Sequence, residues 1–183
     1  MKFIKDILLF DIQATGPDYD KDPIIQLAAV LLDKDNLLEK KFFNSYVRVS
    51  LLEATISHHA QLLSIPFETM QKSAKIYDVT KNFRLIFGND LLLGAHNVSR
   101  LLFLKQAFKK AAVPWDYNHQ FLDLWTLGYL HTLHYGIKKM PTFHTFVDLF
   151  ALKQKNRHNA FERVRLSGEI FRRIIERTEN AYH

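Results

Sequence analysis

The stretch that most constrains this chain runs from Leu8 to Gly16, where an apolar strand meets an acidic residue and then a glycine. A second apolar run follows over residues 23–30 after a polar loop, which indicates two neighbouring strands joined by a short connection. The acidic residue is Asp11, and it has two interpretations. A carboxylate at a strand end can be a metal ligand, and an aspartate there is also common at the start of an ordinary turn.

The composition favours one soluble globular domain over residues 1–183. Hydrophobic residues make up 48% of the chain and charged residues 24%. The formal net charge is +6, which favours a polyanionic partner or an anionic surface. The absence of cysteine excludes disulfides and thiolate zinc sites, and fits an intracellular, cytoplasmic protein. The charged start and the short apolar run after it are typical of neither a signal peptide nor a membrane span.

Hydrophobic periodicity predicts an α/β chain. Three segments with short connections indicate an antiparallel meander, and the apolar run 91–95 is typical of a strand buried on both faces. The last segment carries the stripe Phe161, Val164, Gly168, Phe171 and Ile175, which is typical of a helix on a core. The expected strands are 5–12, 24–33, 40–49 and 91–95. One helix is expected to start at Pro66, and the next to run through Val79 to Phe87. The other expected helices are 98–112, 122–135, 141–152 and 158–177. This order predicts an α/β sandwich with a mixed sheet.

Four segments together give the chain a resemblance to a known family. They are Phe10-Asp11-Ile12-Gln13-Ala14-Thr15-Gly16, Ile24-Ile25-Gln26-Leu27-Ala28-Ala29-Val30, Gly94-Ala95-His96-Asn97 and His158-Asn159-Ala160. In this order they resemble the DEDDh-type (DnaQ-like) 3′-to-5′ exonucleases, and the resemblance covers nearly the whole chain. It implies a ribonuclease H-like three-layer sandwich, in which helices flank a mixed five-stranded sheet.

The resemblance also implies a site in which four carboxylates hold two metal ions, usually magnesium, and a histidine acts as the general base. Asp11 matches the first carboxylate and His158 matches the histidine. The degenerate positions are Gln13, Leu101 (or Arg100, if one residue is deleted) and Arg163. The nominal charge of the four carboxylate positions rises from minus four to zero with Leu101, or to plus one with Arg100. The sequence therefore predicts a dismantled metal site.

A partly buried aspartate that has lost its metal needs another cation or hydrogen-bond donors. Arginine supplies both, so we expect Arg163 or Arg100 to pair with Asp11. Glu162 is not expected to restore the site, because a helical neighbour of position 163 points about 100° away. No bound metal is expected, with Asp11 as the candidate ligand if there is one, and an active enzyme would require Mg²⁺ or Mn²⁺.

Three functional hypotheses follow from these residues. The first is an exonuclease-fold protein that is inactive or severely impaired. Its partner is single-stranded nucleic acid or a replication, repair or RNA-processing protein, and no membrane binding is expected. Its candidate binding residues are Thr15, His96, Asn97, Arg100 and Arg163. The second is an active metal-dependent 3′-to-5′ exonuclease on single-stranded DNA or RNA, and the third is a structural subunit without nucleic-acid affinity. Zinc is not expected, because the pairs His58–His59 and His131–His134 have no evident third ligand.

Overall fold

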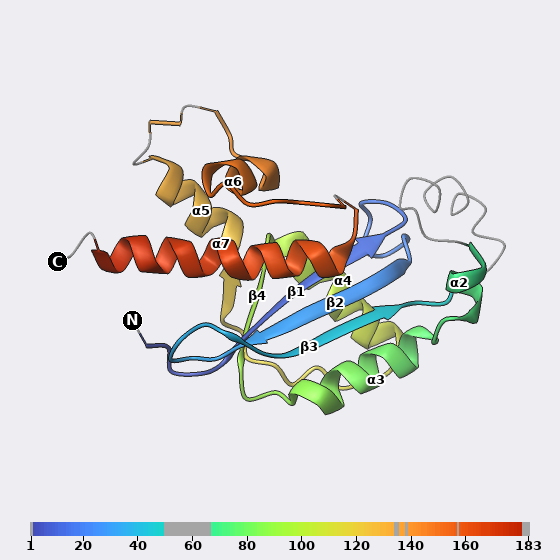
Figure 1. Cartoon of the computed structure of the whole chain (residues 1–183). Coiled ribbons are helices and arrows are strands. Elements are labelled where there is room, and N and C mark those ends of the chain that lie inside the picture. The colour runs from blue at the N-terminus through green and yellow to red at the C-terminus, as the bar shows by residue number, and fades with distance from the viewer. Residues whose placement is uncertain (1, 50–66, 134–135, 138, 157, 181–183) are drawn as a thin grey trace.

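The computed structural model describes residues 2–49, 67–133, 136–137, 139–156 and 158–180, and its centre is a five-stranded sheet (Figure 1). The strands lie in the order β3-β2-β1-β4-β5. The first three are antiparallel, whereas β4 and β5 continue the sheet in parallel with β1. The strands are β1 (Ile7–Ala14), β2 (Ile24–Leu32), β3 (Glu39–Tyr46), β4 (Leu92–Ala95) and β5 (Phe121–Asp123). The helices are α2 (Phe67–Lys72), α3 (Ile76–Phe87), α4 (Val98–Lys110), α5 (Leu124–Leu133), α6 (Phe143–Leu149) and α7 (Ala160–Asn180).

The sheet is covered on both faces because its central strands are apolar throughout. All of β2 is buried, and so is all of β1 except Gln13, as expected for strands between two helical layers. Leu8 and Phe10 belong to the core cluster that α3 and α4 cover, while Ile7 and Leu9 belong to the cluster under α7. Figure 1 shows α7 lying across one face of the sheet and α3 on the other. The predicted sandwich with a mixed five-stranded sheet is confirmed.

The fifth strand corrects the prediction of a helix from residue 122. Phe121–Asp123 pairs in parallel with β4, with Leu93 opposite Phe121, and α5 begins only at Leu124. The Asp123 carboxylate accepts a hydrogen bond from the Thr126 amide (2.8 Å), so this residue ends the strand and caps the helix. Three residues are too few to show a period of two, which is why the sequence pattern merged the strand with the helix after it.

Other boundaries differ from the prediction by a few residues. Helix α4 ends at Lys110 because Ala112 adopts a left-handed backbone, with φ of 51°. Strand β3 ends at Tyr46, after which Val47 makes an isolated bridge to Ala74 and donates its amide to the Ile25 carbonyl (2.9 Å). Four residues named in the sequence analysis lie outside the described residues: Pro66, His58, His59 and His134.

The start of α7 is fixed by two side-chain amides rather than by the predicted position 158. The Asn159 Oδ1 atom accepts hydrogen bonds from the amides of Phe161 (2.9 Å) and Glu162 (3.1 Å), which makes Asn159 the N-cap. The buried Gln26 of β2 accepts from the Ala160 amide (3.0 Å). These bonds hold the first turn of α7 over the sheet. Among the described residues, no helix is long and apolar enough to cross a membrane.

We predict that Gln26→Ala lowers the free energy of unfolding by about 1–3 kcal/mol, because it leaves the buried Ala160 amide without an acceptor. The matched control is Gln120→Ala, which removes an exposed amide. Chemical denaturation followed by circular dichroism measures both variants. Equal stability of the two variants would contradict the anchoring role of Gln26.

Candidate functional site

Asp11 lies near the end of β1, opposite Ala28 of β2, and only 3% of the residue is exposed. Side chains alternate between the faces of a strand, so Asp11 and Gln13 share the face of Ile7 and Leu9. That face is the one covered by α7. The first matched position of the family site therefore points toward the helix that carries Arg163.

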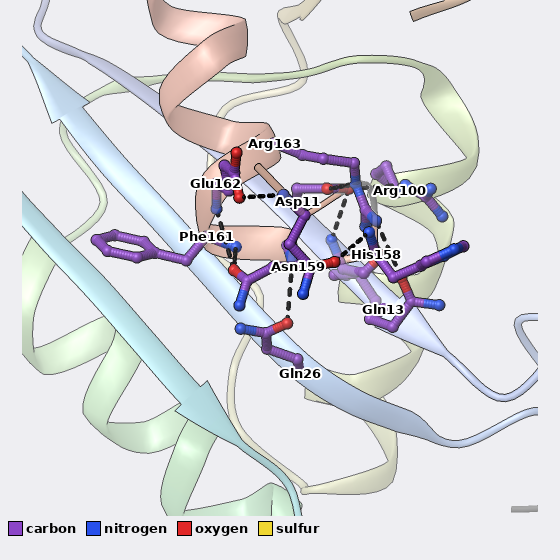
Figure 2. A network of polar contacts seen from close by, with 12 residues as sticks. Asp11, Gln13, Gln26, Arg100, His158, Asn159, Phe161, Glu162 and Arg163 are labelled. Carbon is purple, nitrogen blue, oxygen red and sulfur yellow. Dashed lines mark hydrogen bonds and ion pairs between the residues drawn. The ribbon is translucent and has the colours of Figure 1, made fainter. Parts of the chain in front are cut away.

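Two arginines from different helices contact the Asp11 carboxylate (Figure 2). The Nε atom of Arg163 in α7 lies 2.5 Å from Oδ2, and the Nε atom of Arg100 in α4 lies 2.9 Å from Oδ1. The Ile12 amide also donates to Oδ1 at 2.8 Å. The predicted pairing of Asp11 with an arginine is confirmed, and it involves both candidates rather than one.

Arg163 is bound by more than the carboxylate. Its terminal nitrogens donate to the side-chain oxygen of Gln13 (3.1 Å) and to the carbonyl oxygen of Ile12 (3.3 Å). Its guanidinium group thus bridges three consecutive residues of β1 and retains a side-chain exposure of 13%. Gln13 replaces a family carboxylate with a neutral oxygen, and that oxygen is used by the arginine.

The structure also distinguishes Arg100 from Leu101. The side chain of Arg100 lies at Asp11, whereas Leu101 packs against the core cluster on the opposite face of the sheet. The two residues diverge because neighbours on a helix are rotated by about 100°. The resemblance implies a third carboxylate beside Asp11, and in this chain Arg100 occupies that place.

The residues at this site do not fit a divalent metal ion. One carboxylate contacts two guanidinium groups, and a hard cation requires several oxygen ligands that are not engaged by other cations. The described part of the chain contains no group of three or more His, Asp and Glu side chains that could hold a metal ion. The acids near the site are engaged elsewhere: Glu162 accepts from the amides of Lys155 and Asn156, and Glu169 pairs with Arg172 and Arg173.

The other predicted site residues make local hydrogen bonds that do not involve Asp11. His158 is exposed, and its backbone amide donates to Asn156 Oδ1 (2.9 Å), a bond that leaves the imidazole ring uninvolved. Thr15 is buried and its amide donates to the Pro23 carbonyl (3.1 Å). Asn97 precedes α4 and accepts from the Ser99 hydroxyl (2.6 Å). Their binding roles stay predictions.

His96 is held neutral next to the site. Its ring packs edge-on against Phe143 of α6, with centroids 5.1 Å apart. Burial lowers the pKa of His96 to about 4, and the charges of Arg100 and Arg163 act in the same direction, against the opposing effect of Asp11. At neutral pH this histidine therefore adds no positive charge to the site.

Sequence reasoning missed Gln26, which is fully buried and anchors α7 through Ala160. Its signal was a glutamine within an otherwise apolar strand, since a buried amide must find hydrogen-bond partners. Asn44 supplies the other partner by accepting from Gln26 Nε2 at 2.9 Å. Gln26 thus positions Arg163 without touching it.

Comparison with known proteins identifies the family. Residues 8–171 match the exonuclease family RNase_T, so the chain belongs to that family. This match confirms the predicted exonuclease family. The nuclease domain of 3′hExo, a DEDDh family member, shares the fold, with 16% identity and a TM-score of 0.74 over 96% of this chain and 94% of that one. E. coli exonuclease I in complex with a dT13 oligonucleotide has 12% identity and a TM-score of 0.81 over 97% of this chain and 42% of that one.

The curated relatives are much longer proteins. DNA polymerase III PolC-type of Bacillus subtilis (strain 168) is 32% identical over 123 residues, which is 66% of this chain and 8% of that protein. The PolC-type polymerase of Caldanaerobacter subterraneus subsp. tengcongensis is 26% identical over 177 residues, or 95% of this chain and 12% of that protein. This chain therefore corresponds in length to a small part of each.

We predict that the free energy of unfolding falls as the pH drops from about 6.5 to about 4, because the pKa of His96 is lowered in the folded chain. Because the pKa is lower in the folded chain, the unfolded chain binds the proton first, and the contribution is complete only above about pH 6.5. Its full size is about 3 kcal/mol. Thermal or chemical unfolding of His96→Gln should show a flatter pH dependence than the wild type. The exposed His119→Gln control should keep the wild-type slope, and a wild-type slope in His96→Gln would contradict the prediction.

Proposed function

We propose that this chain is a non-cleaving member of the exonuclease family that binds single-stranded nucleic acid. The observation that carries the proposal is the position of Arg163, whose guanidinium binds Asp11, Gln13 and the Ile12 carbonyl together. A positive group at that place repels a divalent ion and engages the oxygen atoms on which the ion would depend.

Loss of the metal ions removes the main source of a nucleophile. Hydrolysis of a phosphodiester near neutral pH requires activation of water, and in this family the resemblance assigns that task to metal ions and a histidine. His158 remains, but without an ion beside it no water is activated for it to deprotonate. The remaining residues therefore support recognition of a strand and not its cleavage.

The relatives and the charge support nucleic acid as the partner. E. coli exonuclease I has been crystallised with single-stranded oligonucleotides and shares the fold, and the PolC-type relatives are DNA polymerases. The net charge of +6 favours a polyanion, because lysine and arginine neutralise phosphates whether or not cleavage follows. A replication protein as an additional partner fits the same relatives.

The decisive experiment incubates the purified chain with labelled single-stranded DNA and RNA in Mg²⁺ or Mn²⁺, with and without chelator. We expect no shortening, and binding that weakens as salt rises. Metal-dependent shortening that the chelator abolishes would establish the active exonuclease instead. Absence of both shortening and binding would favour the structural subunit.

We predict that the triple variant Gln13→Glu, Arg100→Asp, Arg163→Asp gains Mn²⁺ binding that the wild type lacks, because it restores four carboxylates around one point. Isothermal titration calorimetry measures the binding. The matched control is the triple variant Gln13→Glu, Leu101→Asp, Arg163→Asp, which retains Arg100. It should bind no Mn²⁺, and it should be less stable because Leu101 packs in the core. Tight Mn²⁺ binding by the wild type would contradict the loss of the metal site.

A further inference from the structure

Arg100 has a guanidinium group that makes an ion pair with Asp11 but no hydrogen bond to a described residue. Its Nε is buried and lies 2.9 Å from Asp11 Oδ1, yet it makes no hydrogen bond to any described residue. The described residues accept no hydrogen bond from its terminal nitrogens either. The Nε is thus occupied by its ion pair with Asp11, whereas the terminal nitrogens belong to a partly exposed side chain and can donate to an acceptor that arrives from solvent. A guanidinium offers up to about five N–H donors in a fixed plane.

Arg100 is also the more accessible of the two arginines at Asp11. Its side chain is 28% exposed, whereas that of Arg163 is 13% exposed and is directed at β1. Figure 2 shows the two side chains reaching Asp11 from separate elements. Arg163 thus fills the interior of the site, and Arg100 is the group that a ligand from solvent can reach.

The charges around Arg100 favour an anion. Asp11 contributes one negative charge against two guanidinium groups, and the neutral His96 contributes none. Asp123 is the other carboxylate that acts on His96, but it is engaged as the cap of α5. Glu162 is directed at the amides of residues 155–156. The contacts at Asp11 therefore leave one guanidinium charge in excess, while Asp123 and Glu162 keep their negative charges and direct them at backbone amides.

We propose that Arg100 is a phosphate-binding residue, which holds one phosphate group of a nucleic-acid strand without a metal ion. This inference rests on the proposed function and names the group that the site recognises. Two parallel N–H donors of a guanidinium match two phosphate oxygens. The arginine neutralises phosphate charge but leaves water unactivated, so it supports binding without hydrolysis.

Arg100→Gln tests the proposal directly. Fluorescence polarisation with a labelled single-stranded DNA oligonucleotide in chelator should show about a tenfold loss of affinity and a salt slope smaller by about 0.7. The matched control is Arg165→Gln, which removes an exposed arginine that already pairs with Glu39 and should change affinity far less. Equal losses in the two variants would overturn the proposal, because they would mean that only overall charge matters.

Asp11→Asn separates an arginine site from a metal site by the sign of its effect. If Arg100 holds the phosphate, loss of the carboxylate makes the site more positive and should tighten oligonucleotide binding about threefold in chelator. A metal-dependent site would instead lose affinity with the same substitution when Mn²⁺ is present and would bind neither variant in chelator. Circular dichroism confirms that the variant is folded, and weaker binding by folded Asp11→Asn contradicts the proposal.

Inorganic phosphate and oligonucleotides with or without a 3′-phosphate distinguish this inference from the proposed function. If the wild type binds no oligonucleotide but inorganic phosphate raises its thermal stability, and Arg100→Gln loses that effect, the proposed function fails and the phosphate site stands. If the wild type binds oligonucleotides and Arg100→Gln binds them equally well, the phosphate site fails alone. Tighter binding of the 3′-phosphorylated strand assigns the site to a terminal phosphate, and equal binding assigns it to an internal one.

Discussion

The ion pair between Asp11 and Arg163 is the interaction on which the rest of the site depends. It joins the first strand to the last helix across 152 residues of sequence, in a setting where both side chains are largely buried. Removing one partner of such a pair leaves an uncompensated charge, which typically costs about 3–5 kcal/mol. Asp11 thus has a structural reason to remain even where it binds no metal, so its presence alone is a poor indicator of catalysis.

The fold tolerates this exchange because the core and the site use different residues of the same strand. Leu8 and Phe10 pack under α4 and α3, and Ile7 and Leu9 pack under α7, whether position 13 is acidic or neutral. Gln26 and Asn159 hold the start of α7 through bonds that do not involve position 163. A change at Gln13 or Arg163 therefore alters the chemistry while leaving the scaffold in place.

Much of this architecture was predictable from local patterns, and the rest required contacts between distant segments. The continuous apolar runs indicated β1, β2 and β4, and the stripe of α7 indicated its buried face. Strand β5 was missed because only its pairing with β4 defines it. Sequence could not choose between Arg100 and Leu101, since a shift of one residue on a helix decides which side chain faces Asp11. The low pKa of His96 depends on α6, which joins it only in the folded chain.

Under the proposed function, the arginines explain how a site can recognise a strand without cleaving it. A divalent ion does two things for a phosphodiester, because it neutralises the phosphate and it activates water. A guanidinium provides the first effect and lacks the second, and its planar donors fit phosphate oxygens. Arg163 is bound to β1 and stabilises the fold, while Arg100 keeps donors that no described residue accepts. Under the proposed function, the two arginines thus divide the task of the metal between stability and anion binding.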